Sequence, residues 1–234
     1  MKKVRIDKLL SDYQFGSRND IKQMIKEHRI FHNHMLVMNA QQKVEYESTI
    51  TVDDIDYRFS EHVYLMLNKP KGYECSHDSQ HPTVYDLIPL PYPKSLFTVG
   101  RLDIDTTGLL LLSTDGDWAH RITAKKNQST KTYLVTLNEL VDERINRLNQ
   151  PIILEPEGKV LAKEINVINE YQILLSITDG KYHQVKRMMH ATGYEVIDLS
   201  RVKIGSLALD EHLDYGRMRN LTSEEKNLVF DIIE

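Results

Sequence analysis

Residues 100–116 read Gly-Arg-Leu-Asp-Ile-Asp-Thr-Thr-Gly-Leu-Leu-Leu-Leu-Ser-Thr-Asp-Gly, and this stretch constrains the structure strongly. Two charged side chains, Arg101 and Asp103, precede a Thr-Thr-Gly turn and a run of four leucines. Four consecutive apolar residues are too few to cross a membrane and are typical of a fully buried strand. The stretch therefore predicts charged groups on a loop beside a buried strand, where functional side chains are held by a rigid scaffold.

The composition is that of an ordinary globular protein, with 41% hydrophobic and 27% charged residues. A chain of 234 residues can hold one large domain, or a small and a medium one. Its one cysteine, Cys75, cannot form an internal disulfide, so we expect a reducing cytosol. Charges at Arg5, Asp7 and Lys8 interrupt any apolar signal-peptide core after the first methionine. We therefore expect a cytoplasmic protein with no membrane partner.

Basic residues are concentrated in patches although the net charge is −4. The first 35 residues hold eight Lys or Arg against four Asp or Glu, whereas residues 36–60 hold two against five. Two further basic stretches are Arg121, Lys125, Lys126 and Lys131, and Lys181, Lys186 and Arg187 with His183 and His190. Together the patches indicate an RNA or phosphate footprint on one face. For any single patch, a solvated helix face is the simpler interpretation.

The first 60 residues predict a small α/β unit. Asp7 can cap a short helix, and Ser17 with Asp20 forms a capping-box pair for a second helix. The second helix buries Ile21, Met24 and Ile25 and exposes four cations, Arg18, Lys22, Lys26 and Arg29. A hairpin with Asn33-His34 at its turn and a strand over Thr49–Val52 follow. The acidic residues Asp53, Asp54 and Asp56 suggest a junction, so we predict domains over residues 1–60 and 61–234.

The second domain alternates strands with short helices. Strands are predicted over Val63–Leu67, Leu109–Ser113, Thr132–Leu137, Val160–Val167 and Tyr171–Ile177. Helices are predicted over Pro82–Ile88, Asp117–Thr123, Gln184–Thr192 and Ser223–Ile232. Because some strands arrive in hairpin-like pairs, the pattern favours an α+β fold with a mixed, mainly antiparallel sheet.

Residues 100–109 closely resemble the catalytic motif of RNA pseudouridine synthases, in particular the RsuA family, which modifies small-subunit ribosomal RNA. Five further segments resemble motifs of that family: Leu67–Tyr73, Lys131–Tyr133, Gly180–Met188, and the closing stretches Arg201–Gly205 and Gly216–Thr222. Residues 3–52 resemble the S-four-type RNA-binding domain, with His28 and His34 where glycine is usual. Those positions favour positive φ.

This resemblance implies a set of roles. Uridine becomes pseudouridine when its base leaves the ribose through nitrogen and rejoins through carbon, so no redox cofactor is needed. Asp103 would attack the ribose or assist removal of a sugar proton, with Lys186 as first and Arg187 as second choice for its cationic partner. Tyr133 would stack the detached base and help remove the proton from carbon 5. The nucleotide must be flipped out, and Arg101 could fill its place and bind phosphate.

Other interpretations of these residues are weaker. An isolated Arg-x-Asp is usually a loop ion pair, and two carboxylates, Asp103 and Asp105, are weak indications of a metal site. His28, His32 and His34 lack cysteine partners for zinc, and Ser113 lacks a nucleophile elbow, so we predict no metal site and no hydrolase triad. The family motifs all occur in order along one chain, and together they argue against these other interpretations.

The pattern from Asp105 to Gly108 is closer to the small-subunit enzymes than to the large-subunit ones. We therefore expect a monomeric 16S ribosomal RNA pseudouridine synthase without a cofactor, acting on that RNA or on a small-subunit assembly intermediate. The alternatives are a large-subunit (23S) enzyme of the same family and a non-catalytic ribosome-assembly factor that binds RNA.

Overall fold

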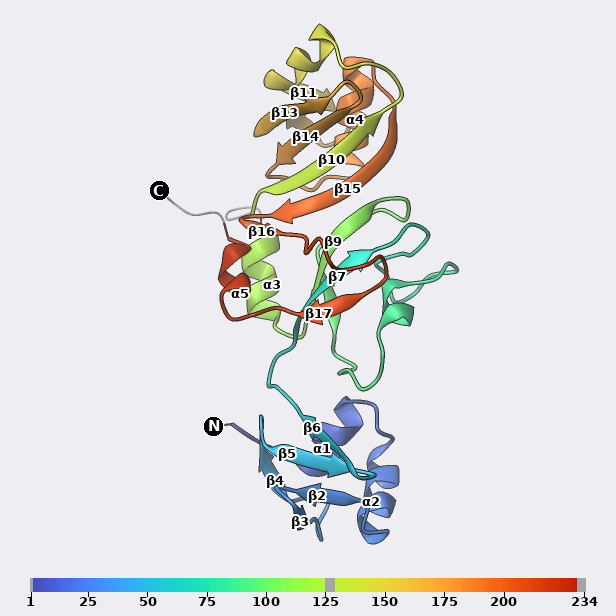
Figure 1. Cartoon of the computed structure of the whole chain (residues 1–234), viewed down its shortest axis with the longest axis vertical. Coiled ribbons are helices and arrows are strands. Elements are labelled where there is room, and N and C mark those ends of the chain that lie inside the picture. The colour runs from blue at the N-terminus through green and yellow to red at the C-terminus, as the bar shows by residue number, and fades with distance from the viewer. Residues whose placement is uncertain (1, 125–128, 231–234) are drawn as a thin grey trace. The chain divides into compact units, whose positions relative to one another are not determined.

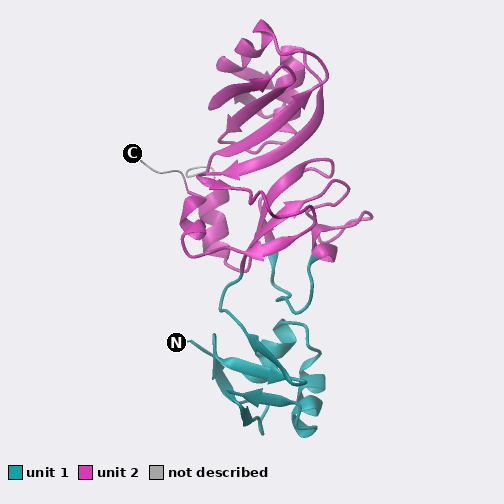
Figure 2. Ribbon diagram, viewed as in Figure 1, with its two compact units in different colours: residues 1–63, 88–97 teal, residues 64–87, 98–234 magenta. Residues whose placement is uncertain are grey.

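A computed structural model describes residues 2–124 and 129–230. The chain forms two compact units (Figure 2), residues 1–63 with 88–97 and residues 64–87 with 98–234. The sequence predicted a division after residue 60 and did not anticipate that residues 88–97 pack with the first unit. In that packing Lys94 donates its backbone N–H to the Asp12 carbonyl (2.9 Å), and Gln14 Nε2 donates to the Tyr92 carbonyl (2.8 Å).

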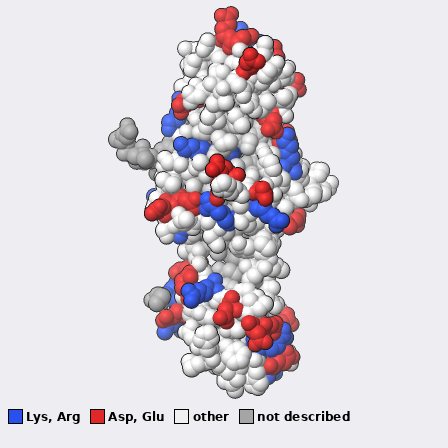
Figure 3. All heavy atoms as spheres, viewed as in Figure 1, with Lys and Arg blue, Asp and Glu red and all other residues white. Residues whose placement is uncertain are grey.

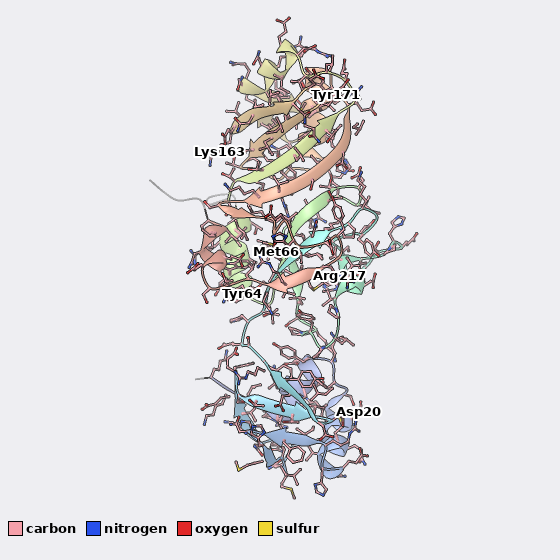
Figure 4. The ribbon with its side chains drawn as sticks, viewed as in Figure 1. Asp20, Tyr64, Met66, Lys163, Tyr171 and Arg217 are labelled. Atoms are coloured by element: carbon pink, nitrogen blue, oxygen red, sulfur yellow. The ribbon has the colours of Figure 1, made fainter. Side chains whose placement is uncertain are left out.

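The first unit combines two helices with two small sheets (Figure 1). Its elements are β1 (Lys3–Arg5), α1 (Ile6–Asp12), α2 (Arg18–Lys26), β2 (Ile30–His32), β3 (Met35–Leu36), β4 (Lys43–Glu45), β5 (Thr49–Val52) and β6 (Ile55–Arg58). One sheet has the order β3-β2-β5-β6, and β1 pairs with β4. The capping box of α2 is confirmed: Ser17 Oγ accepts from the Asp20 N–H, and the Asp20 carboxylate (Figure 4) accepts from the Ser17 N–H.

The predicted junction at the acidic residues is wrong. Asp53 and Asp54 adopt positive φ (51° and 64°) and form the turn between β5 and β6. Asp56 lies in β6, where its carboxylate accepts a hydrogen bond from Thr51 Oγ1 (2.6 Å). Aspartate tolerates the left-handed conformation, so an acidic run can build a hairpin as readily as a linker. The chain leaves the first unit only after Val63.

The second unit is built on a long sheet with strand order β13-β14-β10-β15-β9-β7-β17. These strands are β7 (Tyr64–Lys69), β9 (Thr107–Ser113), β10 (Lys131–Leu137), β13 (Glu164–Asn169), β14 (Gln172–Ile177), β15 (Val196–Ile204) and β17 (Met218–Asn220); β8 (Phe97–Val99) pairs with β9, and β16 (Leu207–Ala208) with β15. Tyr64 and Met66 lie on β7, and Arg217 directly precedes β17 (Figure 4). The predicted α+β fold with a mixed, mainly antiparallel sheet is confirmed.

Short helices and a hairpin complete this unit (Figure 1). They are η1 (Val84–Leu87), α3 (Gly116–Thr123), η2 (Glu143–Asn149), α4 (Gln184–Thr192) and α5 (Glu225–Leu228), with the hairpin β11 (Ile152–Leu154) and β12 (Gly158–Val160). The predicted strand Val160–Val167 is wrong, since β12 ends at Val160 and β13 begins at Glu164. The predicted helix Pro82–Ile88 is a 3-10 turn, and the end of the predicted helix Ser223–Ile232 lies outside the described residues.

The leucine run is buried as predicted, because β9 lies between β15 and β7. Its register with β15 is parallel over two residue pairs, Thr107 with Ser200 and Gly108 with Arg201. A Cβ on Gly108, whose φ is +98°, would lie 2.3 Å from the Arg201 carbonyl oxygen. Only glycine fits this close approach of two backbones. The β9–β15 seam joins the β13-β14-β10-β15 half of the sheet to the β9-β7-β17 half.

Within the described part of the chain, no helix has the length and apolar character needed to cross a membrane.

Candidate active site

A cavity of 540 Å³ lies in the second unit, where the loop before β9 meets the segment before α4. Three of the side chains selected from the sequence line it: Arg101, Asp103 and Tyr133. Arg101 is exposed and has no salt-bridge partner among the described residues. Much of the remaining wall comes from residues 74–76 and 180–185. The cavity thus brings together residues that lie far apart in the sequence.

Lys186 lies between two carboxylates. Its Nζ is 3.4 Å from Asp103 Oδ2 and 2.5 Å from Asp105 Oδ1. Burial opposes ionisation of Asp105, but the hydrogen bond and charge of Lys186 outweigh it and lower the pKa of this carboxyl. The Asp103 side chain is only half-buried, at 31% exposure, which leaves it open to a ligand. Lys186 therefore contacts two carboxylates, and Asp103, the one selected from the sequence, is the more distant of the two.

His183, which the sequence placed only in a basic patch, is a further neighbour of Asp103. Its Nε2 lies 3.7 Å from Asp103 Oδ1, whereas Lys186 contacts the other oxygen of this carboxylate. The residue has φ +47° directly before α4, a conformation that is uncommon outside glycine. Non-glycine residues held in this region often lie at functional sites. No pattern in the sequence indicated the positive φ of this residue or its contact with Asp103.

Tyr133 forms a wall of the cavity from β10. Its side chain is 8% exposed. The pairing of β10 with β15 shifts register between Thr132 and Tyr133, so Tyr133 faces Arg201. Bulges of this kind often lie next to active sites, where they re-aim a side chain. The ring can offer a flat apolar surface to a planar ligand in the cavity.

Lys69, for which no sequence pattern indicated a role, fixes the loop that carries Asp103. This lysine is completely buried at the end of β7. Its Nζ donates to the carbonyls of Thr106 (2.8 Å) and Asp103 (3.0 Å), with longer contacts to Pro70 (3.2 Å) and Ile104 (3.4 Å). Burial lowers the pKa of Lys69, and the nearby Cys75, Asp105 and Asp103 oppose this effect.

Arg187, the second choice as partner of Asp103, points elsewhere. It donates to the Glu157 carboxylate (2.8 Å), to the Tyr182 carbonyl (3.2 Å) and to the Glu155 carbonyl. The hydrogen bond from Arg187 lowers the pKa of Glu157. These contacts tie α4 to the connection between β11 and β12. Its predicted contact with RNA must therefore compete with contacts inside the protein.

The cations predicted on the second helix differ in their surroundings. Arg18, Lys22 and Lys26 are exposed, follow one another at four-residue spacing on α2, and have no salt-bridge partner among the described residues. Arg29 lies beyond the helix and binds Asp53 (2.6 Å) and Glu27 (3.1 Å). Figure 3 shows basic and acidic side chains intermingled on the visible face of this unit. Lys125 and Lys126 of the second basic stretch lie outside the described residues.

Within residues 2–124 and 129–230, no three His, Cys, Asp or Glu side chains converge in a way that could hold a metal ion.

The family model described as RNA pseudouridylate synthase matches residues 63–191. This chain belongs to the RNA pseudouridylate synthase family, and it is an RNA pseudouridine synthase.

Individual relatives show which kind of pseudouridine synthase the chain is similar to, and they confirm the resemblance to the RsuA family. "Ribosomal small subunit pseudouridine synthase A" of Pasteurella multocida (strain Pm70) is 38% identical over 226 residues, covering 95% of this chain and 97% of the relative. The protein of the same name from Escherichia coli (strain K12) is 40% identical over 228 residues, covering 95% and 98%. A solved structure described as a pseudouridylate synthase has a TM-score of 0.68 at 36% identity and covers 97% of this chain and 99% of its own.

Proposed function

We propose that this enzyme converts a specific uridine of 16S ribosomal RNA to pseudouridine. Support comes from relatives named as small-subunit enzymes, to which the chain is similar along nearly its whole length. The observation that carries the chemistry is that Asp103 and Tyr133 line the same cavity. Lys186 lies 3.4 Å from the Asp103 carboxylate. The working substrate is the naked RNA or a small-subunit particle during assembly. An enzyme with this substrate would act in the cytoplasm, as a monomer and without a cofactor.

In the proposed reaction the target uridine leaves the RNA stack and enters the cavity, because its reacting bonds are inaccessible in a helix. The Asp103 carboxylate attacks the ribose at C1′, or assists loss of the neighbouring sugar proton, as the N1–C1′ bond breaks. The freed base turns on the Tyr133 ring. Its C5 then bonds to C1′ while the bond between Asp103 and C1′ breaks, or, on the second route, while the removed proton returns to the neighbouring sugar carbon. The C5 proton then leaves with help from the phenol, and N1 takes up a proton, so that no atom is gained or lost.

Lys186 supplies positive charge beside the carboxylate, and Asp105 holds that lysine in place. A fixed cation of this kind stabilises an ionised carboxylate in a site from which water is largely excluded. Arg101 at the cavity edge binds phosphate or fills the place of the flipped nucleotide. In this proposal the first unit, predicted as an S-four-type domain, binds RNA phosphates through α2, which gives affinity and position rather than base specificity.

Mapping pseudouridine in ribosomal RNA from cells with and without this gene tests the proposal. We expect one site in 16S RNA to be lost and to return when the wild-type gene is restored. Restoration by the Asp103→Asn variant would instead contradict the catalytic assignment. Loss of a site in 23S RNA alone would mean that the enzyme acts on the large subunit. Tritium release from 5-tritiated uridine in the purified reaction distinguishes turnover from binding.

A further inference from the structure

Tyr182 is an exposed aromatic ring at the mouth of the active-site cavity. Its residue is 70% exposed, yet it also lines the cavity wall. One face of its ring stacks on the imidazole of His183, with centroids 3.8 Å apart and planes inclined by 17°. Across the described residues, no other ring covers its second face. A large aromatic surface is therefore presented to solvent beside the carboxylate loop.

Two contacts hold Tyr182, one at its backbone and one at its ring. The Tyr182 carbonyl accepts a hydrogen bond from Arg187, which is itself held by Glu157. His183 supports one face of the ring and lies 3.7 Å from Asp103 through its Nε2. A ring that is held before the ligand arrives loses little conformational entropy on binding. The pair of rings, Tyr182 and His183, thus forms a prepared stacking surface next to the reacting carboxylate.

A nucleobase is the ligand that this surface fits. When a uridine is flipped out of its stack, the bases on either side lose a stacking partner. Single-stranded RNA is commonly bound by stacking of its bases on aromatic side chains. The cavity that takes the target uridine opens beside Tyr182, so the base nearest to this ring belongs to an adjoining nucleotide. Arg101 also lines the cavity and is exposed, which makes the cavity edge suitable for a phosphate.

We infer that Tyr182 is the stacking platform for a nucleobase directly adjacent to the flipped-out uridine. This inference deepens the proposed function, because it concerns how the same site holds its RNA. Stacking accepts every base, so Tyr182 contributes affinity and positioning, with little discrimination between bases. Through His183 the platform lies against Asp103, which places the adjoining nucleotide in a fixed position relative to the carboxylate.

Fluorescence of 2-aminopurine tests this inference directly. The probe base is placed on the 5′ or the 3′ side of the target uridine in the 16S RNA fragment that mapping identifies. Binding is followed with Asp103→Asn protein, so that no turnover occurs. We expect quenching for one of the two probe positions, retained in Tyr182→Phe and lost in Tyr182→Ala. Tyr171→Ala, which removes another exposed tyrosine outside the cavity lining, is the matched control and should quench normally.

Steady-state kinetics distinguish stacking from a disturbance of His183. With Asp103 intact, Tyr182→Ala should raise KM by about tenfold or more and change kcat little, the order expected when one base–aromatic stack is removed. On an RNA with an abasic site at the quenched position, wild type and Tyr182→Ala should have equal KM. Unchanged quenching at both probe positions in Tyr182→Ala would overturn the inference, as would a loss confined to kcat on both RNAs. Quenching without wild-type turnover would count against the proposed function and leave the stacking role intact.

Discussion

The ammonium group of Lys69 lies 3.0 Å from the carbonyl oxygen of Asp103, so a buried cation holds the backbone of the residue whose carboxylate faces the cavity. The same group reaches the Thr106 carbonyl at 2.8 Å and thereby spans the whole loop. These bonds leave the loop little freedom to move away from Tyr133 and Lys186.

Replacing Lys69 with Met should lower both activity and stability. The loop carbonyls would lose their donor, and an unsatisfied buried polar group costs about 1–3 kcal/mol. A displaced Asp103 should reduce kcat by about a hundredfold while RNA binding persists.

Because burial lowers the pKa of Lys69, the folded state binds fewer protons than the unfolded chain between that lowered value and about 10.4, the ordinary lysine value. In that window wild-type stability should rise with pH through this group, and the Met variant should lack the rise.

Urea denaturation from pH 7 to about 10.5, just past the ordinary lysine pKa, measures this difference, and single-turnover kinetics measure the loss of rate. The matched control is Lys71→Met, which removes an exposed lysine two residues away that pairs with Asp198. Equal kcat in wild type and Lys69→Met would show that the loop keeps its position without the lysine.

Asp103→Asn keeps the size of the side chain and removes its charge. We expect tritium release to fall by at least roughly a thousandfold, because the amide cannot act as a nucleophile or base. RNA binding, followed by filter retention, should remain. Asp117→Asn, at an exposed position early in α3, is the control and should retain full activity. Turnover at the wild-type rate in Asp103→Asn would remove this residue from the mechanism.

Tyr133→Phe separates stacking from phenol chemistry. The ring should still hold the base, so RNA affinity should stay close to that of wild type, whereas product formation should stall before the C5 proton leaves. Rapid quenching of single turnovers would detect a stalled species. If the Phe variant releases tritium at the normal rate, the phenol has no chemical role and only the ring surface is needed.

Lys186 and Arg187 are adjacent in sequence, but their substitution should have different effects. Lys186→Met removes the cation between Asp103 and Asp105 and should lower kcat by about a hundredfold, the order seen when one group that stabilises developing charge is removed. Arg187→Met removes the donor to Glu157 and should chiefly lower the melting temperature. A larger loss of kcat in Arg187→Met than in Lys186→Met, at temperatures where both are folded, would reverse the two assignments.

The exposed cations of α2 should carry RNA affinity. Replacing Arg18, Lys22 and Lys26 together with Ala should weaken binding and reduce the slope of log K against log salt by about 0.7–0.9 for each phosphate that the variant no longer neutralises. The control removes three lysines of the same unit that already pair with acids, Lys2, Lys3 and Lys8. Equal slopes for the two triple variants, on naked RNA and on precursor particles, would show that α2 is not the RNA anchor.

These substitutions are a cleaner test than deleting residues 1–60, the first domain predicted from the sequence. Residues 88–97 pack against the first unit through Lys94 and Tyr92, so the truncation would strip a partner from a segment of the remaining chain. Charge removal on an exposed helix face leaves that packing unchanged.

Local patterns predicted some elements to the residue. The strand Thr49–Val52 and the helix Gln184–Thr192 have the predicted bounds, because alternation and helical periodicity are properties of neighbouring residues. The burial of Lys69 has no such signature. A lysine before a Pro-x-Gly turn is ordinarily exposed, and the loop around Asp103, far along the chain, gives this one its two shortest hydrogen bonds. The partner of Arg187 is equally non-local, since Glu157 lies on a different element well upstream.

The β9–β15 seam holds the two parts of the active site together. Asp103 belongs to the loop that enters β9, whereas Tyr133 and Lys186 belong to elements on the β15 side, and two residue pairs of parallel register join these halves. Gly108 lets the backbones touch at this point. Opening of the sheet at this seam would therefore separate the carboxylate from the ring and the ammonium group as well.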